Sequence, residues 1–404
     1  MTLKGEFSKL ELMQGRVGFI PSGWKFMHLN KAFNIKNTFR KPINEGERNE
    51  NPGSHPYYGP TKIQGYIASY EQDGDYVLIG EDGDHFLKYR TQSMTQLVSG
   101  KCTVNNHAHI IEGTEEATKE WFYYYFMHRD IFSFLSRQGA GRYKLNKAAL
   151  EKLPVLIPPL PEQKKIAQIL STWDKAIETV EKLIANSQQK KKALMQQLLT
   201  GKKRFPEFDG EWKEVRLVDV LNDKKRKGKI VPTNENQSGM AYIGSTSFKG
   251  NFEIYTDSSD AVTCLPNDIL VLWDGENAGK VTTGLKGAVS STVVRYCINQ
   301  TKADSLFLTY NLLRDNYKVR AIREGSGIPH MPGDFEQWYH IALPALEEQK
   351  RITSILSSTD QEIETWQQEL THLKQEKKAL MQQLLTGKRR VKLSKQENHH
   401  ANLL

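Results

Sequence analysis

Cysteine is scarce in this sequence, and long apolar runs are missing from it. Among 404 residues there are three cysteines, Cys102, Cys264 and Cys297, and they lie far apart. An odd, scattered set argues against a disulfide framework or a metal site, so we expect reduced thiols in a cytoplasmic protein. No stretch approaches the roughly 18 apolar residues of a membrane span. The first residues also lack the apolar core of a secretory signal.

The sequence has the composition of an ordinary, moderately basic globular protein. Hydrophobic residues make up 38% and charged residues 25% of the chain, and its formal net charge is +9. The length favours two or three domains. A basic balance favours a polyanionic partner, although charge alone does not separate nucleic-acid-binding proteins from others.

One unit occurs twice in the chain. The segment that starts at Pro158 matches the segment that starts at Pro344, with about 27 of 47 positions identical at one offset and without a gap. Upstream, the same offset places Gly-Ala-Gly at residues 139–141 on Gly-Ser-Gly at residues 325–327. Each unit therefore ends in a nearly constant segment.

The parts before these segments have diverged. Residues 19–25 resemble residues 205–213, but residues 30–135 and 220–320 share little. We call residues 1–153 the first body and residues 205–342 the second body. Different surfaces on the bodies and one surface on the constant segments favour an adaptor over an enzyme.

Each constant segment predicts a long helix with a coiled-coil seam. Apolar residues alternate at spacings of four and three. Pro161 suits the first helical turn, and Gly201 and Gly387 suit helix ends. About 38 residues give a rod near 57 Å. The seam positions are Ile166, Leu170, Trp173, Ile177, Val180, Ile184, Lys191, Leu194 and Leu198 in the first helix, and Ile352, Leu356, Ile363, Trp366, Leu370, Leu373, Lys377, Leu380 and Leu384 in the second.

Two matched helices in one chain favour an intramolecular pair, whereas a single such helix would favour pairing between chains. The pair should run antiparallel, because the second body leaves the end of the first helix and its own helix must return. Lys191 and Lys377 occupy the same seam position. Each is either a snorkelling side chain or part of a polar layer that fixes the register.

The two bodies are predicted to be mixed α+β modules. Short β-rich runs broken by glycine predict strands, of which residues 268–273 are the clearest. Residues 120–135 predict a helix with an aromatic face, and residues 305–320 predict a second helix.

Basic, aromatic and amide side chains interleave in loops of both bodies. Lys and Arg suit phosphate contacts, whereas Asn, Gln, Arg and Ser can read base edges. We therefore predict DNA contacts by Tyr57, Tyr58, Lys62, Lys88, Tyr89, Arg90, Asn105, Asn106, His107, Arg142, Tyr143 and Lys144 in the first body, and by Lys224, Lys225, Arg226, Lys249, Asn277, Lys280, Arg323 and His330 in the second.

Motifs of catalysis and cofactor binding are incomplete. Residues 275–281 resemble a P-loop, but Val281 stands where Ser or Thr must hold magnesium, which favours a hairpin turn. His107 and His109 lack the spacing of a zinc helix. No Asn-Pro-Pro-Tyr or Asp-Pro-Pro-Tyr run of the amino-methyltransferase type is present. We predict no catalytic residue and no metal site, and an enzyme with a dispersed site is one alternative.

The arrangement resembles the specificity subunit of type I restriction–modification enzymes. Two divergent bodies, each followed by Pro-x-Leu-x-Glu-Gln and a long helix ending in Leu-Leu-Thr-Gly, carry the resemblance. It implies an α+β fold with two target-recognition domains on an antiparallel coiled coil and a pseudo-twofold internal repeat. The implied domains are residues 1–153 and 205–342 for recognition, 154–204 and 343–390 for the helices, and 391–404 for a flexible tail.

The resemblance also implies a function. Each body would read one half of a bipartite, asymmetric DNA site in the major groove, with or without a flipped adenine. The helices would set the spacing and dock two methyltransferase subunits, which restriction subunits join. S-adenosylmethionine, ATP and magnesium would serve those partners, and no cofactor is expected in this chain. A scaffold for two protein-binding modules, without DNA contact, is the other alternative.

Overall fold

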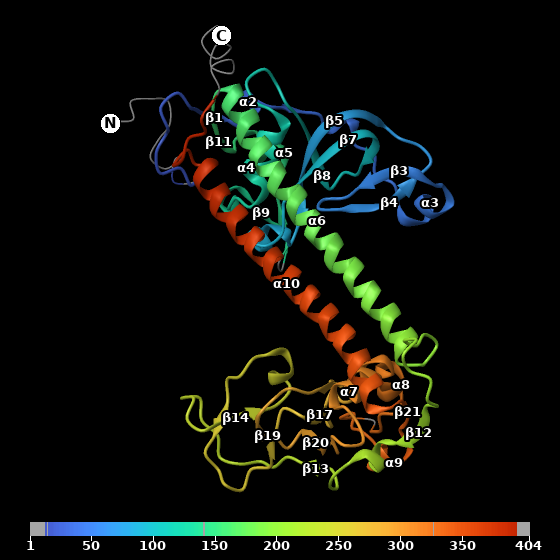
Figure 1. Ribbon diagram of the computed structural model, residues 1–404. Helices are drawn as coiled ribbons and strands as arrows, with labels where there is room; N and C mark the ends of the chain where they lie inside the picture. The colour runs from blue at the N-terminus through green and yellow to red at the C-terminus, as the bar shows by residue number, and fades with distance from the viewer. Residues whose placement is uncertain (1–12, 14, 140–141, 326, 394–404) are drawn as a thin grey trace. The chain divides into compact units, whose positions relative to one another are not determined.

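The computed structural model describes residues 13, 15–139, 142–325 and 327–393, and it divides into two compact units (Figure 1). The first unit comprises residues 1–179 and 370–404, and the second comprises residues 180–369. Each unit therefore joins one body to the beginning of its own long helix and to the end of the other long helix. Of the predicted flexible tail at residues 391–404, residues 394–404 lie outside the described residues, as do parts of the two Gly-x-Gly matches, whereas Val391 packs against the core of the first unit.

Short strands and helices make up the first body. They are β1 (Lys25–His28), α2 (Leu29–Ala32), β2 (Asn34–Ile35), η1 (Asn37–Phe39), α3 (Glu45–Glu50), β3 (Pro52–Tyr58), β4 (Ile63–Ile67), β5 (Gln72–Gly80), β6 (Asp82–Gly83), η2 (His85–Lys88), β7 (Thr95–Val104), β8 (Ala108–Glu112), α4 (Lys119–Met127), η3 (Phe132–Phe134), β9 (Ser136–Arg137), β10 (Tyr143–Lys144) and α5 (Lys147–Glu151), followed by β11 (Pro154–Ile157) and the long helix α6 (Leu160–Leu198).

The second body also consists of short strands and helices. They are β12 (Lys213–Arg216), η4 (Leu217–Val220), β13 (Arg226–Lys227), β14 (Met240–Ile243), η5 (Ser247–Lys249), β15 (Tyr255–Thr256), β16 (Thr263–Cys264), β17 (Asp268–Leu272), β18 (Val281–Thr282), β19 (Gly287–Val289), β20 (Val293–Cys297), α7 (Ser305–Arg314), α8 (Asn316–Ala321), α9 (Phe335–Trp338) and β21 (His340–Leu343), followed by the long helix α10 (Leu346–Leu384). Most of its strands form two four-stranded sheets, β13-β20-β17-β18 and β15-β14-β19-β16. Among the described residues, no helix combines the length and apolar character that crossing a bilayer requires.

Strand β5 lies inside the first body's sheet, whose strand order is β2-β8-β5-β7-β3-β4. Strands β3 and β7 run parallel, and the other neighbours run antiparallel. Val77 and Ile79 pack in the core that includes α4, whereas Leu78 packs with Val98 and Ile110 in a second cluster. Successive strand residues face opposite sides of a sheet, so β5 is covered on both faces.

Strand β17 has the same role in the second body. It lies between β20 and β18 in the sheet order β13-β20-β17-β18, with both neighbours antiparallel. Ile269 and Val271 pack in the core that includes α7, and Leu270 and Leu272 pack in a cluster with Ile243. The predicted strand at residues 268–273 is therefore confirmed.

The two bodies share one backbone frame, although their sequences do not match. Gly80 of β5 lies opposite Ala108 of β8, and Leu272 of β17 lies opposite Val293 of β20. Strands β1 and β11 pair antiparallel before α6, as β12 and β21 do before α10. Helices α4 and α7 start 186 residues apart, which is the offset of the constant segments. Main-chain pairing preserves this frame without requiring particular side chains.

One buried glutamine ties each long helix to its body. The Gln163 side chain accepts a hydrogen bond from the Thr118 backbone N–H at 2.9 Å, and Gln349 accepts one from the Asp304 N–H at 2.8 Å. Thr118 and Asp304 are the N-caps of α4 and α7. The two helix starts are therefore held in the same way in both units.

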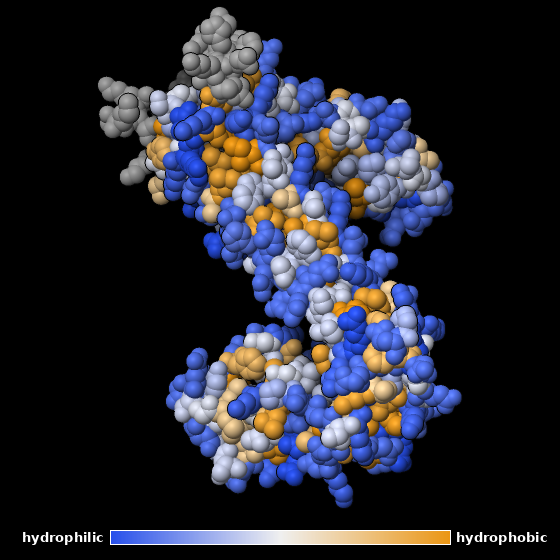
Figure 2. All heavy atoms as spheres, in the orientation of Figure 1, coloured by the Kyte–Doolittle hydropathy of each residue, from blue (hydrophilic) through white to orange (hydrophobic). Residues whose placement is uncertain are grey.

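The long helices follow the predicted seam and helix ends. Every predicted seam position is buried or half-buried. Gly201 and Gly387, just beyond the helix ends, have φ of 68° and 67°, the left-handed geometry that glycine adopts readily. In the first unit, Figure 2 shows hydrophobic residues gathered between α6 and α10 within an otherwise mostly hydrophilic surface.

A buried carboxylate holds the end of the other helix in each unit. Glu162, which is 2% exposed, accepts two hydrogen bonds of 2.7 Å from Arg390 and one of 3.0 Å from the Trp24 indole. Glu348, which is 1% exposed, accepts bonds of 2.9 and 2.7 Å from Arg204 and one of 3.2 Å from the Trp212 indole. We call each Trp–Glu–Arg set a carboxylate clasp.

A second polar set lies further along each pair of helix ends. In the first unit, Asp174 accepts a 2.7 Å hydrogen bond from the Tyr124 hydroxyl and pairs with Lys377, whose ammonium lies 5.6 Å from the Tyr124 ring centre. Burial, together with the bond to Asp174, raises the pKa of Tyr124 far above its ordinary value, so its hydroxyl remains a donor.

The second unit repeats this Tyr–Asp–Lys set. Asp360 accepts a 2.7 Å hydrogen bond from the Tyr310 hydroxyl and a 2.5 Å bond from Lys191, which lies 5.2 Å from the Tyr310 ring centre. The two seam lysines are therefore members of a polar layer rather than snorkelling side chains. Within each unit, the contacts of later residues in one helix are with earlier residues of the other helix. The predicted antiparallel pairing is therefore confirmed there.

Two predicted helices are too long. The helix expected at residues 120–135 ends at Met127, whose carbonyl accepts a hydrogen bond from the Met94 N–H. The helix expected at residues 305–320 breaks after Arg314, because buried Asp315 binds Arg314 and the Tyr339 hydroxyl. In both cases a contact distant in sequence overrides local helix preference.

We predict that Arg204→Ala destabilises the second unit by roughly 3–5 kcal/mol, because it leaves the buried Glu348 carboxylate without its cation. Hydrogen exchange should speed up in β12 and at the start of α10, and it should not change in the first unit. Lys203→Ala, at the exposed neighbouring position, is the matched control. Unchanged exchange in the second unit would contradict a stabilising role for the clasp.

Candidate nucleic-acid interface

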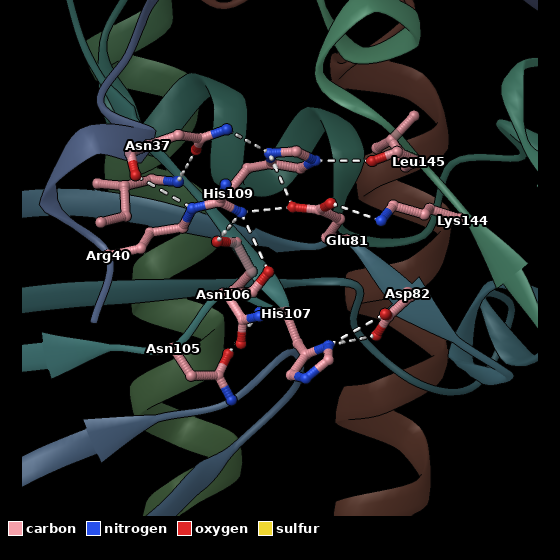
Figure 3. Close-up of polar contacts among 12 residues, drawn as sticks. Asn37, Arg40, Glu81, Asp82, Asn105, Asn106, His107, His109, Lys144 and Leu145 are labelled. Carbon is pink, nitrogen blue, oxygen red and sulfur yellow. Dashed lines mark hydrogen bonds and ion pairs between the residues drawn. The ribbon is translucent and has the colours of Figure 1, made fainter. Parts of the chain in front are cut away.

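Three segments of the first body meet at the end of β5 (Figure 3). The Glu81 N–H donates to the His107 carbonyl, and the Leu145 N–H donates to the Glu81 carbonyl, each at 2.7 Å. Lys144 of β10 lies opposite Asp82 of β6. We call this meeting point, formed by residues 81–83, 105–107 and 142–145, the first junction.

Glu81 is the acidic centre of the first junction. Its carboxylate pairs with Arg40, lies 3.2 Å from the Lys144 ammonium, and lies 3.8 Å from a ring nitrogen of His109. Burial acts to raise the pKa of Glu81, but the hydrogen bonds from Arg40 and Lys144 hold it below its usual value. Glu81 therefore stays ionised and fixes two cations near the surface.

His109 anchors the same junction from inside. It is fully buried, its Nε2 lies 2.7 Å from the Leu145 carbonyl, and its Nδ1 lies 2.8 Å from the Asn37 side-chain amide. Burial lowers its pKa, so the ring is neutral, with Nε2 donating to Leu145 and Nδ1 accepting from Asn37. Of the two histidines, His109 therefore has a structural role.

Asp82 faces the rim of the junction. It lies 2.9 Å from Nδ1 of His107 and 3.4 Å from the guanidinium of Arg142. A pocket of about 500 Å³ opens beside His107, and Arg48, Gln64 and Asn106 also line it. The rim therefore presents imidazole, guanidinium and amide groups, which are the groups that read base edges and bind phosphates.

The second body has an equivalent junction with different side chains. The Trp273 N–H donates to the Thr292 carbonyl at 2.7 Å, and the Met331 N–H donates to the Trp273 carbonyl at 2.9 Å. Asp274 forms a bridge with His330, as Asp82 does with Lys144. We call this meeting point, formed by residues 273–275, 290–292 and 328–331, the second junction.

Charges are placed differently in the second junction. Trp273 stands where the first body has Glu81, and the Lys225 ammonium lies 4.7 Å from its ring centre. Asp274 pairs with Lys227 at 2.6 Å. The same backbone frame therefore carries a charged centre in one body and an aromatic centre in the other.

The loop that resembles a P-loop is a turn between strands. Strands β17 and β18 pair antiparallel on either side of it, and Gly275 donates its N–H to the Pro329 carbonyl at 2.8 Å. Arg323 donates to the Glu276 carbonyl at 3.0 Å. The predicted hairpin turn is confirmed, and Asn277 in this turn donates to the Ser245 hydroxyl at 3.5 Å.

The structure places the predicted DNA contacts in several groups. Tyr89 and Arg90 line a separate pocket of about 830 Å³ with Lys377 and Met381, whereas Lys88 pairs with Asp84 at 2.6 Å. Other predicted residues, exposed or half-buried at the surface, are Tyr58, Lys62, Lys224, Arg226 and Lys249. Those brought to or beside the two junctions are Asn106, His107, Arg142, Tyr143, Lys144, Lys225, Asn277, Lys280, Arg323 and His330.

Two predicted residues are inside the first body. Tyr57 is 1% exposed and its hydroxyl accepts a hydrogen bond from the Ile43 N–H. Asn105 is 4% exposed and its amide bonds Gln64 and the His107 N–H. Both also line the pocket beside His107, where their polar atoms already have protein partners, so DNA contact by these two residues stays a prediction.

Several residues at the junctions are not among the contacts predicted from the sequence. Arg40, Glu81, Asp82 and Lys227 carry charges there, and Ile328 is exposed beside His330. An acidic residue two positions after a buried strand, as in Asp82 and Asp274, was the available signal. In the described ranges, no group of three or more His, Cys, Asp or Glu side chains is placed to hold a metal ion.

We predict that the first body loses stability as the pH falls from about 6.5 to about 4. Burial lowers the pKa of His85 from 6.5 to about 4, although Asp84 and Asp82 oppose the shift. The unfolded chain binds the proton first, so folding is favoured above this window and weakens within it, by roughly 3 kcal/mol. Urea unfolding at several pH values, followed by pulsed hydrogen exchange, measures β5 and β17 separately. His85→Leu should reduce the pH dependence of stability in β5. An equal pH dependence in the wild type and in His85→Leu would contradict the assignment to His85.

The comparisons with known proteins fit both the repeat and the fold. The family model described as type I restriction modification DNA specificity domain matches residues 21–186 and again residues 209–375. A type I restriction enzyme specificity subunit from Haemophilus influenzae is 27% identical over 354 residues, covering 82% of this chain and 86% of the relative. The MjaVIII specificity subunit from Methanocaldococcus jannaschii is 35% identical over 188 residues, covering 45% of this chain and 43% of the relative.

Solved structures show the same fold. The type I restriction–modification S subunit from M. genitalium has a TM-score of 0.66 at 14% identity, covering 93% of this chain and 98% of that one. A chain from a study of type I R-M complex assembly has a TM-score of 0.52 at 16% identity, covering 91% and 99%. Because the family model matches most of the sequence in two copies, this chain belongs to the type I restriction–modification specificity subunits, a non-catalytic family, and contains two recognition domains.

Proposed function

We propose that each body reads one half of a bipartite, asymmetric DNA site. The observation that supports this most directly is the pair of equivalent junctions. They share main-chain hydrogen bonds but differ in their side chains, with Glu81 and Lys144 in one and Trp273 and His330 in the other. A common frame with different polar groups is what reading two different base sequences requires.

The chemistry of the junction rims suits duplex DNA. Arg142, His107 and Asn106 in the first body, and Asn277 and Arg323 in the second, offer donors and acceptors for base edges and phosphates. The chain's net charge of +9 favours attraction to a polyanion. We infer that the bases are read in the major groove, where each base pair has a distinct pattern of groups.

We also propose that the long helices dock two methyltransferase subunits. Identity at buried seam positions follows from packing, but identity at exposed positions needs another reason. Lys192, Gln196 and Gln197 of α6 are exposed, and so are their counterparts in α10. Those counterparts are the identical residues Lys378, Gln382 and Gln383. Two matching exposed faces suit two copies of one partner.

The remaining parts of the proposal follow from this assembly. Restriction subunits would join the methyltransferases, and S-adenosylmethionine, ATP and magnesium would be used by those partners. A cytoplasmic location is supported by free thiols at Cys102 and Cys264, whose pKa values burial raises to about 11. Such buried, protonated thiols suit a reducing compartment.

We predict sequence-specific, salt-sensitive DNA binding by the chain in complex with a methyltransferase partner. The logarithm of the binding constant should fall linearly with the logarithm of salt concentration, with a slope near −0.9 per phosphate contact. Methylome sequencing of cells with and without the chain should reveal one bipartite motif. Replacing residues 30–150 by another family member's body should change one half of that motif. Methylation without any bipartite motif would refute the proposal.

We predict that Lys192→Glu combined with Gln196→Glu removes one of two bound methyltransferases, because the changes reverse the charge of one docking face. Native mass spectrometry of the complex measures the stoichiometry directly. Asn186→Glu is the matched control, since residue 186 is exposed on α6 and differs from its counterpart, His372. Two methyltransferases still bound to the double variant would place docking elsewhere.

A further inference from the structure

The segment that ends each junction holds a different residue at the same backbone position. The Leu145 N–H donates to the Glu81 carbonyl, and the Met331 N–H donates to the Trp273 carbonyl. Three residues before these anchors lie Arg142 in the first body and Ile328 in the second. The two positions are 186 residues apart, the offset of the constant segments, so they are structural equivalents.

Both side chains are presented to solvent. The Arg142 side chain is 60% exposed and its guanidinium lies 3.4 Å from the Asp82 carboxylate. Ile328 is 72% exposed, directly before Pro329 and His330, whose segment pairs with the turn after β17. A single exposed isoleucine is ordinary; one that projects from the rim of a junction, where its equivalent is an arginine, indicates a difference in recognition.

The acidic residues near Arg142 and Ile328 also have different partners. Asp82 pairs with Arg142 and so limits the directions in which the guanidinium can point. Its equivalent, Asp274, pairs with Lys227 at 2.6 Å. The second junction therefore uses its acidic residue elsewhere and presents an aliphatic side chain at the position where the first presents a charge.

We propose that Arg142 and Ile328 are equivalent base-reading residues, Arg142 binding the edge of a guanine in one half-site and Ile328 contacting the methyl group of a thymine in the other. This inference rests on the proposed DNA-reading function and deepens it. A guanidinium matches the O6 and N7 acceptors of guanine, and the thymine methyl is the apolar group of the major groove. Asp82 is then a positioning residue for Arg142.

Methylome sequencing of cells that contain the whole complex tests where each residue acts. Arg142→Ala should relax one guanine position in one half of the motif, and Ile328→Ala should relax one thymine position in the other half. Arg142→Lys keeps the charge but loses the planar guanidinium fork, so it should weaken the preference for guanine at the same position less than Arg142→Ala does. Arg137→Ala removes a charge on β9, across the same hairpin, and should weaken binding to all duplexes alike.

Modified duplexes test the contacts themselves. With the purified complex, replacing the assigned guanine by 7-deazaguanine removes N7 and should weaken wild-type binding roughly 5- to 150-fold, while leaving Arg142→Ala indifferent. Replacing the assigned thymine by uracil removes one methyl and should weaken wild-type binding about four-fold, while leaving Ile328→Ala indifferent. Ile230→Ala, an 86% exposed isoleucine of the same body, should retain the full uracil penalty.

The outcomes separate this inference from the function on which it rests. A wild-type bipartite motif that both alanine variants retain unchanged overturns the inference and leaves the proposed function standing. The inference is also overturned if the variants lose base preference at positions other than guanine and thymine, or if both lose it in the same half of the motif. If the wild-type complex methylates no bipartite motif, the proposed function itself fails.

Discussion

The carboxylate clasps are the constraint on which the rest of the structure depends. Glu162 and Glu348 are almost fully buried, and an ionised carboxylate inside a protein is costly unless a cation and hydrogen bonds compensate it. In each unit the cation comes from the end of the other helix, as Arg390 or Arg204. The buried carboxylate beside each body is therefore neutralised only when the end of the other body's helix packs against it. The antiparallel arrangement within each unit follows from electrostatics as well as from the apolar seam.

Two kinds of interaction allow the bodies to diverge while the frame persists. Main-chain hydrogen bonds define the junctions, and these tolerate a change from Glu81 to Trp273 because they use no side-chain atoms. The tie to the long helices uses specific side chains, above all Gln163 and Gln349, and these are identical. The side chains that differ between the bodies are thus ones on which the backbone frame does not depend. The same side chains are the ones that can contact DNA bases.

The sequence was a good guide to the helices and a poorer one to the bodies. Heptad spacing, Gly201 and Gly387 indicated the seam and the helix ends, because those signals are local. The shared frame of the bodies was not visible, since strand register leaves little trace in residue identity. Tyr57 shows the same limit within the site, because an aromatic residue beside a strand end suits either a buried or an exposed place, and the structure buries it. Glu162 and Arg390 recur as Glu348 and Arg204, so charges repeated at both ends of the duplicated segment could have revealed the clasps.

The closure of the first unit by the end of α10 has a consequence for how the chain is made. Met381, Leu384 and Leu385 belong to the hydrophobic core of the first unit, and Arg390 neutralises its buried Glu162. Synthesis proceeds from the N-terminus, and domains generally fold as they emerge. The body that is synthesised first therefore cannot complete its core until residues 381–390 have been made, whereas the second body is completed soon after Glu348 and the start of α10 emerge. A chain that ends before residue 380 would therefore lack part of the core of the first body, although that body lies at the opposite end of the sequence.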